Sequence, residues 1–178
     1  MIVNERDLRE EQALDIAKKM LVAARTAPKG KGIDIIECAV VTGDDKEALA
    51  VEMETYSAET GYKFLLRDAN NVRQSQCVVI IGTRSRVQAL NCGHCGFPTC
   101  GEKPTAVPCE MNSVDVGIAL GSAAATAADS RVDSRIMFSA GMAAQRLQLL
   151  GEDVRQVYAI PISIASKSPF FDRPKHEG

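Results

Sequence analysis

Residues 92–100 read Cys92-Gly-His-Cys-Gly-Phe-Pro-Thr-Cys100, and Cys109 follows after eight intervening residues. Four of the six cysteines in the 178-residue chain therefore fall within eighteen positions, in a segment rich in glycine and proline. A glycine directly follows three of these cysteines, and glycine lets the backbone turn tightly enough for several sulfur atoms to converge on one point. The spacing C-x2-C-x4-C-x8-C is therefore typical of a metal-binding loop.

Three kinds of cysteine site compete for this spacing. Disulfides require an oxidising compartment, and the first residues, Met1–Asp7, are charged almost at once and do not resemble a secretory signal. Zinc favours two separated C-x2-C pairs or a mixture of Cys and His ligands; only one such pair is present, although His94 leaves a mixed site open. A four-iron cluster is ligated by four thiolates, usually three close together and a fourth further along the chain. This pattern fits best, so we predict a 4Fe-4S cluster, with zinc as the alternative.

The run Asn91-Cys-Gly-His-Cys-Gly-Phe-Pro-Thr-Cys-Gly101, with a later Pro-Cys pair, resembles the small four-iron ferredoxin-type domain of anaerobic redox proteins and electron-transport subunits. The whole chain resembles the uncharacterised bacterial and archaeal proteins that are described as containing a ferredoxin domain. We expect the ferredoxin-type loop to span residues 91–109. The resemblance implies that the cluster is ligated by Cys92, Cys95, Cys100 and Cys109.

Length and composition indicate a single globular domain over residues 1–178. Apolar residues make up 46% of the chain and charged residues 25%, which are ordinary globular values. The net charge of −2 argues against a nucleic-acid partner, which would require a basic surplus. The longest apolar runs, residues 77–82 and 117–128, are much shorter than the roughly 20 residues needed to cross a bilayer, which argues against a membrane partner. Six cysteines without a secretory signal indicate a cytoplasmic protein.

Hydrophobic periodicity and helix-stop residues predict the elements before the loop. Asn4 caps an amphipathic helix that ends at about Ala27, because the residue before Pro28 is pushed out of helical geometry. A strand over residues 33–41 leads into a helix of about fifteen residues that Gly61 terminates. Residues 62–66 are ambiguous, and residues 67–75 indicate a polar connection or a helical turn.

Residues 76–82 are apolar throughout and predict a strand buried on both faces. Beyond the loop we expect helices over residues 114–128 and 142–150, the first capped by Asn112 or Ser113. A last strand covers residues 156–165, in which Pro161 indicates an edge or a bulge. This order predicts an α/β (α+β) sandwich, in which helices flank a small sheet of three to four strands. The cysteine-rich metal loop is inserted between a strand and the most buried helix.

The N-terminal helix, the segment Ala23-Ala-Arg-Thr-Ala-Pro-Lys-Gly30 and the strand that ends in Thr-Gly-Asp resemble the opening of flavin-dependent nitroreductases. The resemblance implies a nitroreductase-like frame and allows FMN as a second cofactor. The flavin would then be bound by Arg25, Thr26, Pro28, Lys29 and Gly30, with Arg173 and Lys175 at its phosphate. Lys29 stands where that family usually has serine. A second interpretation is open for the basic residues, since a cation at a helix C-terminus interacts favourably with the helix dipole.

The helix expected over residues 114–128 carries Gly117, Gly121 and Ala125 at four-residue spacing. Such a smooth ridge lets another backbone approach closely, and its ordinary interpretation is a central helix buried by its own sheet. The alternative is a contact between subunits. The nitroreductase resemblance favours this alternative, since it implies a homodimer with flavin sites at the interface.

Two classes of function follow from these features. In the first, the protein is a cytoplasmic iron–sulfur redox protein that transfers electrons to an unidentified redox partner, or a flavin-assisted oxidoreductase. In the second, a structural or regulatory metal, either a cluster or zinc, displays a partner surface and the protein is not an enzyme. The sequence locates no catalytic set, because its two histidines, His94 and His176, lie in the metal loop and the tail.

Overall fold

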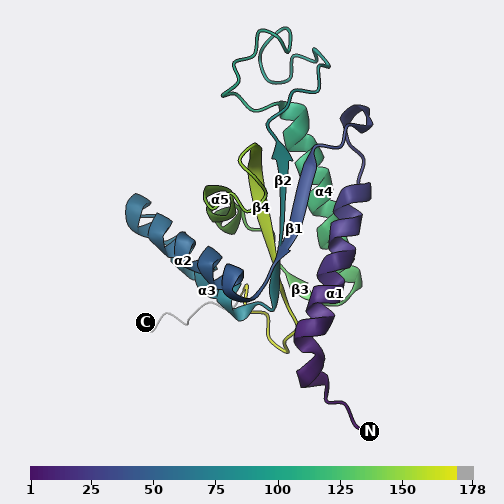
Figure 1. Ribbon diagram of the computed structural model, residues 1–178, viewed down its shortest axis with the longest axis vertical. Coiled ribbons are helices and arrows are strands. Elements are labelled where there is room, and N and C mark those ends of the chain that lie inside the picture. The colour runs from purple at the N-terminus through teal and green to yellow at the C-terminus, as the bar shows by residue number, and fades with distance from the viewer. Residues whose placement is uncertain (172–178) are drawn as a thin grey trace.

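An antiparallel sheet lies at the centre of the computed structural model, which describes residues 1–171 (Figure 1). Its strands follow the order β1 (Ile36–Val41), β2 (Cys77–Arg84), β4 (Val154–Ser163) and β3 (Asp133–Ser134). The helices around it are α1 (Glu5–Thr26), the 3-10 helix η1 (Gly30–Gly32), α2 (Gly43–Thr60), α3 (Phe64–Gln74), α4 (Glu110–Asp129) and α5 (Phe138–Arg146). This is the predicted α+β fold, with a small sheet flanked by helices.

Strand β2 explains why helices cover both faces of the sheet. Side chains alternate between the two faces along a strand. Val78 and Ile80 pack into one core with residues of α2, α3 and α5, whereas Val79 and Ile81 pack into the other with residues of α1 and α4. Figure 1 shows the same division of the helices between the two faces. A strand with consecutive apolar side chains on both faces therefore specifies a sandwich of three layers.

The predicted ends of the first two helices are confirmed. The Asn4 side chain accepts a hydrogen bond from the Arg6 amide at 3.1 Å, so it caps α1. Ala27 has extended geometry with ψ 140°, as expected for a residue that precedes a proline. Gly61 adopts the left-handed conformation with φ 75° and ends α2.

Several local predictions need correction. Residues 64–74 form the full helix α3 rather than a polar connection or a helical turn, because Leu65, Ala69 and Val72 recur at helical spacing and are fully buried. The helix expected over residues 142–150 is α5, at Phe138–Arg146.

Strand β4, which carries Pro161, lies between β2 and β3 and is not an edge strand. Its pairing with β2 does shift register, but between Arg155 and Tyr158 rather than at Pro161. Ala159 exchanges two hydrogen bonds with Met137 on the side of β3, and backbone groups alternate along a strand, so the Pro161 nitrogen also faces that side. The proline therefore removes no hydrogen bond from the pairing with β2.

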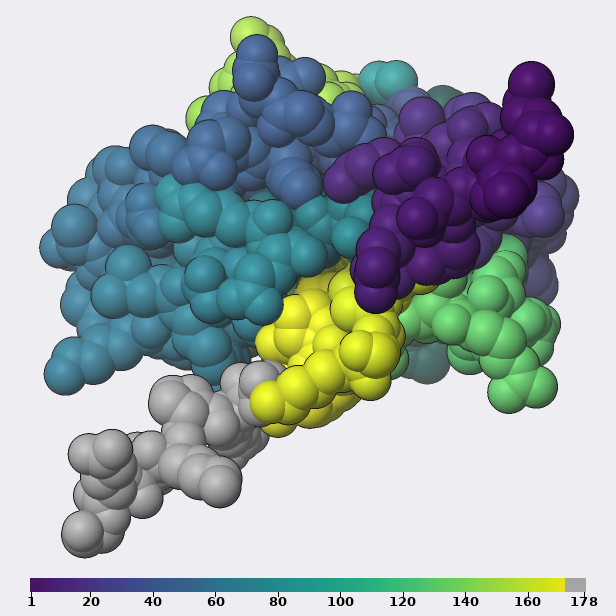
Figure 2. Space-filling model, turned by 90° about the horizontal axis from the view of Figure 1, so that it is seen from below, coloured from purple at the N-terminus to yellow at the C-terminus, as the bar shows by residue number. Residues whose placement is uncertain are grey.

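The segment after β4 closes the end of the sandwich that lies opposite the cysteine-rich loop. Figure 2 views this end and shows the segment (yellow) between α1 (purple) and the teal surface that contains α3. Phe170 is buried in the same core as Leu65 of α3, so an aromatic side chain docks this segment. Within residues 1–171, none of the helices combines the length and apolar character needed to cross a membrane.

Candidate functional site

The cysteine-rich loop projects from one end of the sheet, between the end of β2 and the start of α4 (Figure 1). Cys92 is exposed, and Cys95, Cys100 and Cys109 are half-buried. Helix α4 begins at Glu110, four residues before the expected start, and Cys109 is its N-cap residue. The last cysteine of the loop is therefore fixed to a rigid element, directly at a helix N-terminus.

Three hydrogen bonds donated by backbone amides shape the loop. The Asn91 side chain accepts a hydrogen bond from the Cys100 amide at 2.8 Å, and the Asn91 amide donates to the Cys100 sulfur at 3.4 Å. The Gly96 amide donates to the Gly93 carbonyl at 2.9 Å, which closes a tight turn. The structure thus returns Cys100 to the entrance of the loop, beside the residue that precedes Cys92.

The four loop cysteines do not converge fully as they lie. Among residues 1–171, no three side chains of His, Cys, Asp or Glu are close enough to share a metal ion. The chemistry of the donor set nevertheless fits a thiolate-ligated metal, since all four are free thiols on one accessible segment. The other two cysteines lie in the sheet, Cys38 in β1 and Cys77 in β2.

Burial makes Cys77 chemically different from the loop cysteines. Its side chain is 1% exposed, and its sulfur contacts the Ala13 carbonyl oxygen at 3.6 Å. Burial raises the pKa of the Cys77 thiol to about 12. The pKa of Cys38 is raised for the same reason. Cys77 is therefore a core residue, as the apolar strand predicted.

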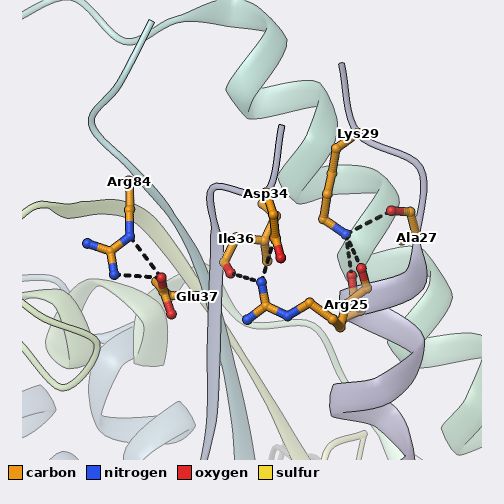
Figure 3. Close-up of polar contacts among 8 residues, drawn as sticks. Arg25, Ala27, Lys29, Asp34, Ile36, Glu37 and Arg84 are labelled. Carbon is orange, nitrogen blue, oxygen red and sulfur yellow. Dashed lines mark hydrogen bonds and ion pairs between the residues drawn. The ribbon is translucent and has the colours of Figure 1, made fainter. Parts of the chain in front are cut away.

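The basic residues at the end of α1 and directly after it form hydrogen bonds within the chain (Figure 3). The Lys29 ammonium donates to the carbonyl oxygens of Ala24 at 3.0 Å and Ala27 at 2.8 Å, and also to that of Arg25. The Arg25 guanidinium donates to the Asp34 carboxylate at 2.5 Å and to the Ile36 carbonyl at 2.7 Å. Lys29 thus satisfies the carbonyl groups at the end of α1, which is the role expected from the helix dipole.

The remaining residues of the expected flavin set are also placed by local contacts. The Thr26 hydroxyl donates to the Val22 carbonyl at 3.0 Å, one turn back in α1, and Pro28 is exposed. The Gly30 amide donates to both carboxylate oxygens of Asp115, at 3.0 and 3.1 Å. Arg173 and Lys175 lie outside the described residues.

A buried polar cluster lies between this segment and the cysteine loop, and sequence analysis did not identify it. It consists of Gln88, Asn112 and Asp115, which are 2%, 3% and 1% exposed. Asn112 does not cap α4 as expected; its side-chain amide instead donates to the carbonyls of Arg84 at 3.3 Å and Arg86 at 2.7 Å. The available signal was Asp115, a charged residue within an otherwise apolar helical run.

Comparison with known proteins gives a family and a fold. Residues 105–173 match the family described as "Uncharacterized protein containing a ferredoxin domain", a range that includes Cys109. An uncharacterized protein of Archaeoglobus fulgidus is 41% identical over 183 residues, which cover 97% of this chain and 98% of that protein.

Solved structures similar to this chain include nitroreductases. A nitroreductase family protein from Clostridium novyi matches with TM-score 0.55 and 14% identity, over 92% of this chain and 76% of that one. An FMN-dependent nitroreductase from Clostridium difficile matches with TM-score 0.55 and 16% identity, over 94% and 79%. At these identities the likeness shows the fold, and it confirms the nitroreductase-like frame.

Proposed function

The chain belongs to the family of uncharacterised proteins that contain a ferredoxin domain, and we propose that it is an iron–sulfur redox protein. A 4Fe-4S cluster is ligated by Cys92, Cys95, Cys100 and Cys109 in this proposal. The proposal rests on one observation: these four free thiols lie together on one accessible loop, whereas Cys38 and Cys77 are built into the sheet. When bound, such a cluster supplies one-electron transfer.

Residues of the chain support this role in two ways. Cys109 directly precedes α4, whose N-terminus carries a partial positive charge that favours negatively charged thiolates and their cluster. Asn91 holds Cys100 beside the entrance of the loop through two hydrogen bonds. The projection of the loop from the end of the sheet leaves it accessible to a redox partner.

Anaerobic purification and metal analysis test the proposal. We expect a broad absorption near ~400 nm that is lost on reduction, and about four iron and four sulfide per chain, as thiolate ligation of a cubane requires. Replacing any one loop cysteine by serine should remove most of the iron. Cys38→Ser and Cys77→Ser serve as matched controls, and both should keep it.

Equal iron content in the wild type and Cys100→Ser would contradict the proposal. Bound zinc with no iron, lost in the loop variants, would favour the alternative of a structural metal that displays a partner surface.

Flavin-assisted oxidoreduction is the second candidate function, because the fold matches that of an FMN-dependent nitroreductase. Among the described residues of the expected flavin set, Lys29 and Gly30 already direct their hydrogen-bond donors to groups of the chain. All three donors of Lys29 face carbonyl oxygens, and the Gly30 amide faces a carboxylate. We therefore expect no saturable quenching of FMN fluorescence up to a concentration on the order of 100 μM, which corresponds to only about 5.5 kcal/mol of binding free energy. Tight, saturable quenching that weakens in Lys29→Glu would establish the flavin function instead.

We also propose that the protein forms a homodimer through the outer face of α4. On this face Val114 is 44% exposed and Ile118 is 40% exposed, with Gly117 and Gly121 beside them. Charged residues of α4 lie elsewhere: Asp115 is buried, and Glu110 and Asp129 stand at the ends of the helix. An uncharged face with a smooth glycine ridge fits the same face of a second copy, since a two-fold axis places identical surfaces together.

A further inference from the structure

The buried polar cluster joins the two ends of the cysteine-rich loop. Gln88 lies three residues before the loop, and Asn112 and Asp115 follow it in the first turns of α4. The side-chain amide of Gln88 donates to the Asp115 carboxylate at 2.6 Å and to the Asn112 carbonyl oxygen at 3.2 Å. Asn112 in turn holds the Arg84 and Arg86 carbonyls at the end of β2. The loop is therefore closed at its base by side-chain hydrogen bonds.

The same cluster also holds the turn after α1. Both carboxylate oxygens of Asp115 accept from the Gly30 amide. The Lys31 ammonium donates to the backbone carbonyl oxygen of Gln88 at 3.1 Å. A β-carbon at position 30 would lie 2.1 Å from Gln88 Oε1, so any side chain at this position would have to displace the side-chain amide of Gln88. Within residues 1–171, Gln88 Oε1 is buried without a hydrogen-bond partner, which raises the cost of holding Gln88 here.

Backbone strain surrounds the cluster. Lys31, Ala89 and Asn91 have positive φ angles of 56°, 54° and 49°, a region that side-chain-bearing residues rarely adopt. One of them lies in the turn after α1, and the other two lie between Gln88 and the first loop cysteine. Such conformations persist only where the surroundings fix them, and they concentrate at functional sites.

We propose that Gln88, Asn112 and Asp115 are positioning residues that set the geometry of the cysteine loop and couple it to the Gly30 turn. The consequence for a cluster rests on the proposed function, whereas the coupling is a property of the chain without metal. Asp115 is a buried carboxylate whose described partners are amide groups. Losing one of these hydrogen bonds would leave buried charge without a partner, which is costly. A side chain at position 30 would displace the Gln88 amide, and this would in turn disturb the contact between Gln88 and Asn112.

Two substitutions test the coupling from opposite ends. Gly30→Ala pushes against Gln88, and Asp115→Asn replaces an acceptor oxygen with an amide that faces other donors. In metal-free protein we expect hydrogen exchange of residues 84–91 and 110–116 and thiol modification of the loop cysteines to accelerate about tenfold, equivalent to about 1.4 kcal/mol of lost protection. The wild type and Asp129→Asn, at the exposed end of α4, are the controls.

A double-mutant cycle isolates the contact between the turn and the cluster. Because Gly30→Ala acts by displacing the Gln88 side chain, the double variant Gly30→Ala/Gln88→Ala should be no worse than Gln88→Ala alone. In iron-loaded protein with full iron content, Asp115→Asn should shift the reduction potential or the electron paramagnetic resonance spectrum of the cluster, which a purely structural role would leave unchanged.

The outcomes separate this inference from the proposed function. Exchange and thiol rates in Gly30→Ala and Asp115→Asn that equal those of the controls would overturn the coupling, whatever the metal content. Normal iron content with an unchanged potential and spectrum in Asp115→Asn would overturn the positioning role. A wild type that takes up no iron would contradict the proposed function, while the metal-free measurements would still decide whether the coupling exists.

Discussion

Residue by residue, the six cysteines divide by their surroundings rather than by their spacing alone. Cys92, Cys95, Cys100 and Cys109 lie on an accessible loop, where thiolates can form and bind a metal. Cys77 belongs to β2 and is buried in the core that the sheet forms with α1 and α4. It therefore behaves as a small apolar residue. The apolar run at residues 76–82 already predicted that Cys77 is buried.

The raised pKa of Cys77 predicts a specific dependence of stability on pH. Burial favours the neutral thiol in the folded protein, so its pKa rises from the ordinary 9.0 to about 12. Between these values the folded state retains a proton that the unfolded state loses, and the free energy of unfolding therefore falls as the pH rises above 9. Between pH 8 and pH 10 we expect the free energy of unfolding of the wild type to fall by about 1 kcal/mol more than that of Cys77→Ala.

Urea unfolding at the two pH values, compared between the wild type and Cys77→Ala, measures the effect. Cys92→Ala is the control, since Cys92 is exposed and should retain the full loss. An identical pH dependence in the wild type and Cys77→Ala would show that Cys77 ionises normally in the fold.

Among the elements, α4 shows why small residues alone do not reveal which face of a helix is buried. Ala119, Ala123 and Ala127 recur every four residues and are buried against α1 and the sheet. Gly117, Gly121 and Ala125 have the same spacing but are exposed. The interpretation that the glycine ridge is buried by the sheet is therefore wrong. Helix α5, which could have covered it, lies on the opposite face of the sheet (Figure 1).

Helix α5 depends on a glycine for its contact with β4. A β-carbon at Gly141 would lie 2.0 Å from the Val157 carbonyl oxygen and 2.6 Å from the Tyr158 α-carbon, both backbone atoms. Gly141→Ala should therefore push α5 off the sheet and lower the free energy of unfolding by about 2–3 kcal/mol.

Gly117→Ala provides the matched comparison in the same type of element. No described atom lies within 4 Å of its added β-carbon, so the higher helix propensity of alanine should stabilise the protein by about 0.5–1 kcal/mol. Urea unfolding of both variants tests the pair. Similar effects from the two substitutions would mean that α5 does not pack against β4 as closely as described.

In the molecule as a whole, the segments with candidate chemistry gather at one end. The cysteine loop, the N-terminus of α4 and η1 all lie at the same end of the sheet in Figure 1. The outer face of α4 starts at that end and runs along the sandwich. A second copy on this face would therefore stand beside the cysteine loop.

The homodimer predicts a defined response to substitution. Gly121→Leu adds a large side chain on the open ridge, which does not disturb the described fold but would force two packed helices apart. In light scattering, the wild type should have twice the chain mass of 19.1 kDa, and Gly121→Leu should have the mass of one chain. Ala58→Leu, at an exposed position of α2, adds the same side chain elsewhere and should remain dimeric. A wild type that is monomeric at tens of micromolar, an ordinary concentration for obligate association, would refute the dimer.

The sequence by itself determined the features that depend on neighbouring residues. The ends of α1 and α2 follow from a capping asparagine, a proline and a glycine, which act on the backbone beside them. The buried strand predicted at residues 76–82 follows from an apolar run, and β2 extends two residues beyond it. The placement of four thiols on one loop follows from the short spacing of the cysteines in residues 91–109.

Only the tertiary structure decided the features that depend on residues far apart in the chain. Lys29 was expected at a flavin or at a helix end, and in the structure its ammonium contacts the carbonyl groups at the helix end. Two ridges of small residues on α4 have the same period, and packing against α1 selects one of them. Gly30, Gln88 and Asp115 meet although 85 positions separate the first from the last. No local pattern encodes such a meeting, because it depends on how β2, α4 and the end of α1 pack at one end of the sheet.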